Sequence, residues 1–209
     1  MNEHKITSIG VFIDGGYYAK INQALEEQHA LQINLGHLFD YIRQQVAQLN
    51  NQEKADCIIT QAHYYRGRFK AGDAGAMHLL YKERRFEDEL IENDVIFHYK
   101  HLRQIKNKDE VTIVEKGVDV WFALEAYQLS QIHQLDYVIL ITGDADHEML
   151  VRKLQTGKHH VILLTWNLGP QSSTSRFLRE EVWKHIELRD ECNIDNTLRH
   201  RLCKAIPIE

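Results

Sequence analysis

Two nearly unbroken apolar runs most constrain the fold of this chain. They are YVILI at Tyr137–Ile141 and HVILLTW at His160–Trp166. A strand that is apolar on both faces has to be covered on both sides, and such strands are typical of a parallel sheet enclosed between helices. The sequence therefore predicts an α/β fold.

The rest of the chain alternates between strand-like runs and segments of helical period. The further runs that predict strands are Ser8–Asp14, Ala55–Tyr65 and Asp94–Lys100. Apolar residues three or four positions apart predict helices in Leu35–Leu49, Met77–Ile91, Val120–Tyr127 and Leu150–Leu154, with a last helix within Ser172–Ile186. Gly157 is expected to end the fourth of these helices. We expect a three-layer α/β/α sandwich with a mainly parallel, Rossmann-like sheet of about five strands.

The 209 residues fit one domain with a short appendage. With two prolines and no low-complexity linker, we assign residues 1–189 to the domain and residues 190–209 to a C-terminal tail. That tail mixes charged and apolar residues, so it could pack on the domain or join two subunits of a homo-oligomer. No stretch approaches the roughly 20 apolar residues of a membrane span, so we expect no membrane partner. Three scattered cysteines favour a reduced, cytoplasmic setting.

Four aspartates occupy positions that the predicted fold would bring together. Asp14 ends the first strand, Asp144 and Asp146 follow the run at Tyr137–Ile141, and Asp119 lies in the first turn of its helix. Ligands of open parallel sheets bind beyond the carboxyl ends of the strands. Carboxylates gathered there repel one another, and Mg²⁺ or Mn²⁺ relieves that repulsion. Taken singly, each aspartate also fits turn or helix-start chemistry, and Asp146 could simply cap the helix beginning at His147.

Two basic segments are candidates for contacts with an anionic substrate, although the net charge is −5. Both are expected to be loops: RGRFK at Arg66–Lys70 and HYKHLRQIKNK at His98–Lys108. Tyr64 or Tyr65, just before the first, could stack on a base. The alternative is that both segments are merely solvated loops. The candidate substrate-binding residues are Arg66, Arg68, Lys70, Lys100, Arg103 and Lys106.

Four segments of the chain, taken in order, resemble the motifs of a known family. They are VFIDGGYY, EKGVDVWFALEAYQL, DYVILITGDADHEMLVRKLQTGKHHVILLTW and STSRFLREEVWKHIEL. The resemblance is to the NYN domain, specifically its LabA-like branch, which is related to PIN nucleases. It implies a PIN-like α/β/α fold and metal-dependent hydrolysis of RNA, single-stranded RNA being the expected partner, by a metal-activated water that leaves a 5′ phosphate on the product. Carried over by position, Asp14, Asp119, Asp144 and Asp146 would be catalytic and would hold Mg²⁺ or Mn²⁺, and Lys116 would position a phosphate.

Two positions depart from the family pattern. Tyr17 stands where members often carry asparagine, and His147 stands where an aromatic such as phenylalanine is common. Neither change removes a carboxylate, so metal binding should survive. The first puts in doubt how substrate is oriented. His147 either contacts a phosphate or the surroundings of the metal, or fills the place of the aromatic in the helix packing.

Several other functions lack their motifs. Gly16 stands where a haloacid-dehalogenase-like phosphatase needs a second aspartate, and the chain has neither a G-x-G-x-x-G turn after its first strand nor a G-x-S-x-G elbow. The remaining rival is a catalytically silent NYN-type module that binds RNA or a protein. The sequence does not determine the RNA target, the choice between RNA and DNA, or the number of metal ions.

Overall fold

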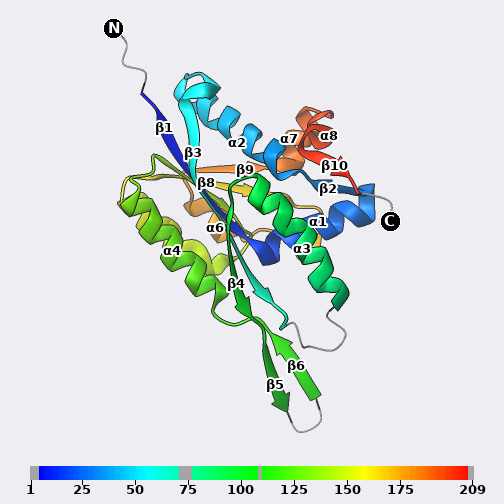
Figure 1. Ribbon diagram of the computed structural model, residues 1–209. Helices are drawn as coiled ribbons and strands as arrows, with labels where there is room; N and C mark the ends of the chain where they lie inside the picture. The colour runs from blue at the N-terminus through cyan, green and yellow to red at the C-terminus, as the bar shows by residue number, and fades with distance from the viewer. Residues whose placement is uncertain (1–4, 71–76, 108–109, 207–209) are drawn as a thin grey trace.

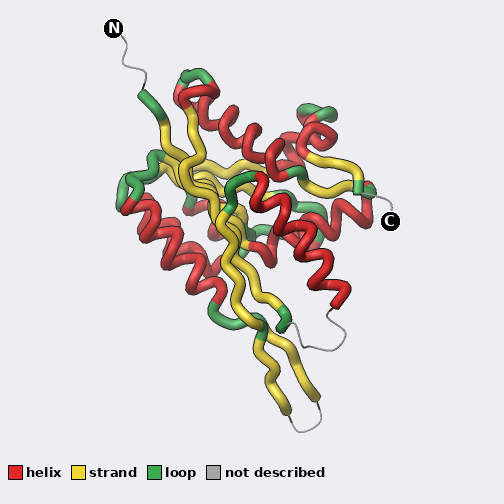
Figure 2. The backbone as a smooth tube through the Cα atoms, viewed as in Figure 1, coloured by secondary structure: helices red, strands yellow, loops and turns green. Residues whose placement is uncertain are grey.

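The computed structural model describes residues 5–70, 77–107 and 110–206, with the backbone alone at 77–80, 82, 104–107 and 110–112. Its centre is a six-stranded sheet in the order β4-β3-β1-β7-β8-β9, in which all neighbouring strands are parallel (Figures 1 and 2). The strands are β1 (Thr7–Asp14), β3 (Cys57–Arg68), β4 (Ile96–His101), β7 (Tyr137–Ile141), β8 (His160–Thr165) and β9 (Lys184–Glu187). The five strands predicted from the sequence are all present.

Helices cover both faces of this sheet. One layer contains α1 (Gly15–His29), α2 (Leu35–Asn50) and α3 (Met77–Glu92), and the other contains α4 (Val118–Ile132), α5 (Glu148–Thr156) and α6 (Arg176–Glu181). Alternation along β1 serves both layers: Val11 and Ile13 pack toward α1 and α2, whereas Phe12 packs toward α4 and α5. The predicted three-layer α/β/α sandwich is confirmed.

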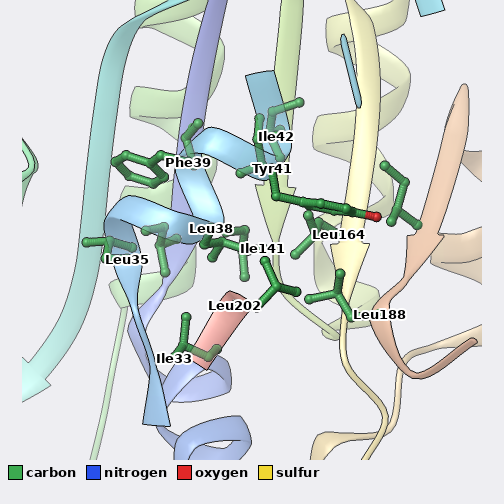
Figure 3. Close-up of a cluster of buried hydrophobic side chains, with 14 of the residues drawn as sticks. Ile33, Leu35, Leu38, Phe39, Tyr41, Ile42, Ile141, Leu164, Leu188 and Leu202 are labelled. Atoms are coloured by element: carbon green, nitrogen blue, oxygen red, sulfur yellow. The ribbon is translucent and has the colours of Figure 1, made fainter. Parts of the chain in front are cut away.

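The contact of α2 with the sheet shows how the first layer is held (Figure 3). The side chain of Asn34 accepts a hydrogen bond from the N–H of His37 and so begins the helix. From there, apolar side chains spaced three or four residues apart face the sheet, where Ile141 of β7 and Leu164 of β8 meet them. These side chains of α2 are Leu35, Leu38, Phe39, Tyr41 and Ile42.

Two predictions about secondary structure are wrong. The stretch expected as one last helix contains only the short α6, and β9 follows it, because Lys184–Glu187 pairs with the open edge of β8. The two basic segments are mainly strand rather than loop: Arg66–Arg68 continues β3, and His98–Asn107 forms the end of β4 and all of β5. Pairing with a neighbouring strand outweighs the polar composition that suggested loops. Lys108 lies outside the described residues.

A two-stranded antiparallel hairpin joins β4 to α4. It consists of β5 (Arg103–Asn107) and β6 (Glu110–Val114), and it projects beyond the carboxyl end of β4, away from the body of the protein (Figures 1 and 2). The chain leaves β6 through Glu115 and Gly117 and enters α4 directly. The hairpin is therefore connected to the helix that carries Asp119.

Helix α4 presents a different face to the core from the one suggested by its spacing. Its buried residues are Val118, Phe122, Ala126 and Ser130. Val120, Leu124 and Tyr127, which share a face in the sequence, are 62%, 64% and 41% exposed. The helix is apolar on nearly all sides, so its period alone does not identify the buried face.

The C-terminal tail packs on the domain in this chain. Helices α7 (Leu188–Ile194) and α8 (Leu198–Leu202) lead to β10 (Cys203–Ala205), which pairs antiparallel with β2 (Leu31–Ile33). Leu198 and Leu202 are buried in the same core as α2. Short 3-10 turns complete the architecture at Lys54–Asp56 (η1), Ala145–His147 (η2) and Pro170–Ser172 (η3). Within the described residues, no helix is both long and apolar enough to cross a membrane.

Candidate active site at the carboxyl ends of β1 and β7

Asp14 is fixed where β1 meets α1. One carboxylate oxygen accepts the N–H of Tyr17 at 3.1 Å and thereby caps α1, and the other accepts the hydroxyl of Thr142 at 3.0 Å. Gly15 is required next to it, because a Cβ there would lie 2.6 Å from Cζ of Tyr64. Asp14 is thus held between the two neighbouring strands β1 and β7, with its carboxylate at the carboxyl ends of the strands.

The turn after β7 carries Asp144 and Asp146. The backbone N–H of Asp144 donates to the hydroxyl of Thr142 at 3.2 Å, and the Asp144 carboxylate accepts the N–H of Asp146 at 3.0 Å. Asp144 therefore caps η2, and the alternative in which Asp146 is the cap is wrong. Both aspartates are exposed. Because Thr142 bonds to both Asp14 and Asp144, it links the two acidic segments, a role that the sequence analysis missed.

Asp119 joins these residues from α4. The helix begins at Gly117, whose φ of 78° lies in the left-handed region that favours glycine, and Asp119 lies in the first turn. Asp119 is exposed as a residue, yet restricted access of water around its carboxyl raises its pKa, and the charges of Asp14 and Asp144 raise it further. The structure thus brings three of the four predicted acids into one electrostatic environment.

A fifth acid, Glu115, was not among the predicted site residues. Its carboxylate accepts the backbone N–H of Gly67 at 2.5 Å. Desolvation raises the pKa of Glu115, and the charges of Asp119 and Asp14 add to that effect, whereas the Gly67 hydrogen bond opposes it. The available signal in the sequence was that Glu115 lies four residues before Asp119. If the helical spacing of α4 were extended back to Glu115, the two side chains would be one turn apart.

The predicted substrate-binding cations are distributed unevenly. The Arg66 guanidinium donates to the hydroxyl of Tyr64 at 3.4 Å, and its charge lowers the pKa of Glu115, so it lies beside the acids. Lys100 donates to the carbonyl of Gly117 at 3.4 Å, at the start of α4.

Of the other predicted cations, one pairs with carboxylates of α3, three are exposed, and one has a side chain that is not described. Arg68 turns to α3, where it pairs with Glu83 at 3.2 Å and Glu87 at 3.0 Å and lies over the ring of Tyr99. The exposed members of the predicted substrate-binding set are Lys70, Arg103 and Lys116. The side chain of Lys106 lies outside the described part of the structure.

Both tyrosines proposed to stack on a base are buried. Tyr64 is 1% exposed and Tyr65 is fully buried. The Tyr65 hydroxyl donates to Glu125 at 2.9 Å, and its ring stacks on that of His98 with the centroids 4.4 Å apart. The expectation of base stacking is therefore wrong, because helices cover both faces of β3.

Tyr17 and His147 are buried as well. The Tyr17 hydroxyl accepts the N–H of Trp166 at 3.3 Å and lies 3.2 Å from the carbonyl of Ser172, so it holds the segment after β8 in place. Its burial raises its pKa to about 12. His147 is 1% exposed and packs on Phe122, which favours the packing alternative, although its Nε2 has no hydrogen-bond partner among the described residues.

As the side chains stand, no three His, Cys, Asp or Glu residues in the described part of the chain are arranged to hold an ion. The donor set nevertheless fits a hard divalent cation, because carboxylate oxygens are the ligands that Mg²⁺ and Mn²⁺ prefer. Asp119 is exposed, so its carboxyl can turn toward Asp14 without disturbing the core, whereas the Asp144 carboxyl already accepts the N–H of Asp146.

Comparison with known proteins gives the family. A search of curated proteins finds no match. A crystal structure of a protein of unknown function from Vibrio parahaemolyticus RIMD 2210633 is similar with a TM-score of 0.55 and 20% identity, covering 91% of this chain and 98% of the other. That likeness supports the fold alone. The family model of the NYN domain matches residues 8–189, which include every acid described above. The chain therefore belongs to the NYN domain family, a family of PIN-like nuclease folds.

Proposed function

We propose that this protein is a Mg²⁺- or Mn²⁺-dependent endoribonuclease of the LabA-like branch. The observation that carries the proposal is the position of Asp14 at the end of β1 and of Asp144 just after the neighbouring strand β7, where the Thr142 hydroxyl donates to the Asp14 carboxylate and accepts the N–H of Asp144. The charges of both aspartates raise the pKa of Asp119, in the first turn of α4. A structural role needs no such gathering of like charges, whereas a cation site does. Membership of the NYN family adds support for nuclease chemistry.

Asp14, Asp119 and Asp144 would hold the cation, with Asp146 supporting them. When bound, the cation would lower the pKa of a water molecule and neutralise negative charge on the scissile phosphate. The chain's own part is to fix these acids. Asp14 is held by the Tyr17 N–H and the Thr142 hydroxyl, and Asp144 by the same hydroxyl and the start of η2.

Cations close to the acids would bind the substrate backbone. Arg66 lies beside Glu115, Lys100 lies at the start of α4, and Lys116 is exposed three residues before Asp119. Such an arrangement suits a polyanion whose scissile phosphate binds at the aspartates while its neighbouring phosphates contact these cations. We propose RNA, single-stranded where it enters, as the substrate. Buried, unpaired thiols at Cys57, Cys192 and Cys203 are consistent with the cytoplasm as its location.

The test is cleavage of labelled single-stranded RNA with Mn²⁺ by wild type, Asp144→Asn and Asp88→Asn. The first substitution keeps the oxygen that caps η2 and removes the charge, whereas Asp88 is an exposed residue of α3 outside the site. We expect Asp144→Asn to lose at least about 10–100-fold in rate and Asp88→Asn to match wild type. Equal cleavage by wild type and Asp144→Asn, or none by either over varied metal and RNA sequence, would favour the silent binding module.

Binding can be tested separately by fluorescence anisotropy over a salt series. Reversing the charges at Lys100, Arg103 and Lys106 should weaken RNA binding and reduce its dependence on salt, because fewer counterions are released. Arg84→Glu on exposed α3 is the control. If neither affinity nor salt dependence changes in the triple variant, the β4–β5 segment does not contact RNA.

A further inference from the structure

We propose that the outer face of α4 is the contact surface of a symmetric dimer of this chain. Such a dimer does not depend on the proposed nuclease activity. The residues of α4 that are exposed after its first turn all fall on one side of the helix, opposite Phe122 and Ala126, which are buried. We call them the α4 face, and they are Val120, Leu124, Tyr127, Gln128, Gln131 and Ile132.

Four side chains of the α4 face are apolar and exposed. Val120, Leu124 and Ile132 are 62%, 64% and 62% exposed. Tyr127 is 41% exposed. A helix that is apolar on all sides is normally buried on all sides. The sheet covers one side of α4, which lies at the outside of its layer (Figure 1), and nothing in the described part of the chain covers these four side chains. We therefore expect another surface to cover them.

Helices α1 and α3 present different side chains to water. The exposed residues of α1 are all polar, namely Lys20, Gln23, Glu26, Glu27, Gln28 and His29. On α3, the exposed apolar residues Tyr81 and Ile91 are separated by the exposed charged residues Arg84, Arg85 and Asp88. Contact with water therefore explains the outer sides of α1 and α3, but it does not explain the composition of the α4 face.

The absence of charge on the α4 face indicates which partner covers it. None of its six residues is charged, in a chain with a net charge of −5, whereas a surface that binds RNA needs cations. An uncharged face can meet an identical face without like-charge repulsion, and the pairing of one patch with the same patch of a second copy is the commonest form of symmetric association. Gln128 suits such a pairing, because its amide both donates and accepts hydrogen bonds.

The experiment measures the mass of the full-length protein by sedimentation equilibrium over about 1–100 μM. We expect wild type to be a dimer at the upper concentrations. Leu124→Glu would bring two like charges together in the middle of the contact, so it should raise the dimer Kd at least about 100-fold. Ile194→Glu is the matched control, because Ile194 lies on α7 and is 83% exposed. It adds the same charge outside the α4 face and should leave the dimer Kd unchanged.

A second variant guards against misfolding of Leu124→Glu, which is checked by far-UV circular dichroism. Gln128→Glu adds a charge to the α4 face with almost no change in size, so it should keep the fold and raise the dimer Kd about 10-fold. The wild-type dimer should also persist as salt is raised, because apolar contacts are not screened.

Four results would overturn the inference. They are a wild type that stays monomeric throughout, charged variants of the α4 face that dimerise as wild type does, an equal loss of dimer with Ile194→Glu, and a wild-type dimer that dissociates in high salt. The first result would leave the α4 face to a different protein. The second and the fourth would place the dimer contact on another surface, and the third would show an effect of net charge alone.

Discussion

The hydroxyl of Tyr17 offers a sharp test of whether this residue is structural. Tyr17→Phe removes the acceptor for the N–H of Trp166 and the partner of the Ser172 carbonyl, both in a buried place. Leaving a buried donor unsatisfied costs about 1–3 kcal/mol. At about 2–4 °C per kcal/mol for a domain of this size, we expect Tm to fall by roughly 4–8 °C for a loss near 2 kcal/mol.

The matched control is Tyr41→Phe. Tyr41 is also buried, but its hydroxyl has no partner among the described residues. Removing that hydroxyl should leave the free energy of unfolding unchanged or raise it. Urea unfolding of both variants, followed by far-UV circular dichroism, gives the comparison. An equal free energy for wild type and Tyr17→Phe would refute the structural reasoning. So would a greater than 10-fold loss of Mn²⁺-dependent cleavage at a temperature where Tyr17→Phe is folded, because that result gives the hydroxyl a role in the reaction.

Three further outcomes are expected. Asp119→Asn should raise Tm at pH 7 while reducing cleavage about 10–100-fold. Folding raises the pKa of Asp119, so the free energy of unfolding falls as pH rises through that pKa, and an asparagine, which does not ionise, avoids this fall. A lower Tm for the variant would contradict this. Arg68→Ala should lower the free energy of unfolding by about 1 kcal/mol and change RNA affinity, measured by fluorescence anisotropy, less than about 2-fold. The reason is that two carboxylates of α3 hold the charge of Arg68. A large loss of affinity would place Arg68 in the RNA-binding surface. Gly143→Ala should cost about 1–3 kcal/mol in urea unfolding, because a Cβ would lie 2.7 Å from Cε2 of Tyr17; unchanged stability would show that the ring moves aside.

The sequence predicts the central part of the fold because its signals are local and strong. Fully apolar strands such as Tyr137–Ile141 can be stable only between two layers, and that requirement determines the layer architecture. β9 could not be predicted in the same way, since KHIE has no strong strand pattern and becomes a strand only against the open edge of β8. The hairpin of β5 and β6 depends likewise on pairing, since RQIKN of β5 is mostly polar and has no strong strand pattern of its own.

For the site, the sequence predicts which acids lie at the carboxyl ends of the strands, but it does not predict which groups hold them there. The positions of Asp14 and Asp144 follow from the strands that they end. The link through Thr142 and the approach of Glu115 to Gly67 depend on distances between segments far apart in the chain. Burial of Tyr64 and Tyr65 was missed for a related reason, because a cluster of aromatic and basic residues has the same composition whether it faces water or a helix.

The pairing of β10 with β2 has a consequence for how the protein is made. Leu198 and Leu202 complete the core around α2, yet they are encoded more than 150 residues after that helix begins. During synthesis, the apolar surface beside β2 stays open until residues 198–205 have left the ribosome. Contacts between such distant segments slow folding and prolong exposure to aggregation. A recombinant version that stops at residue 189, where the family match ends, would keep that surface open permanently.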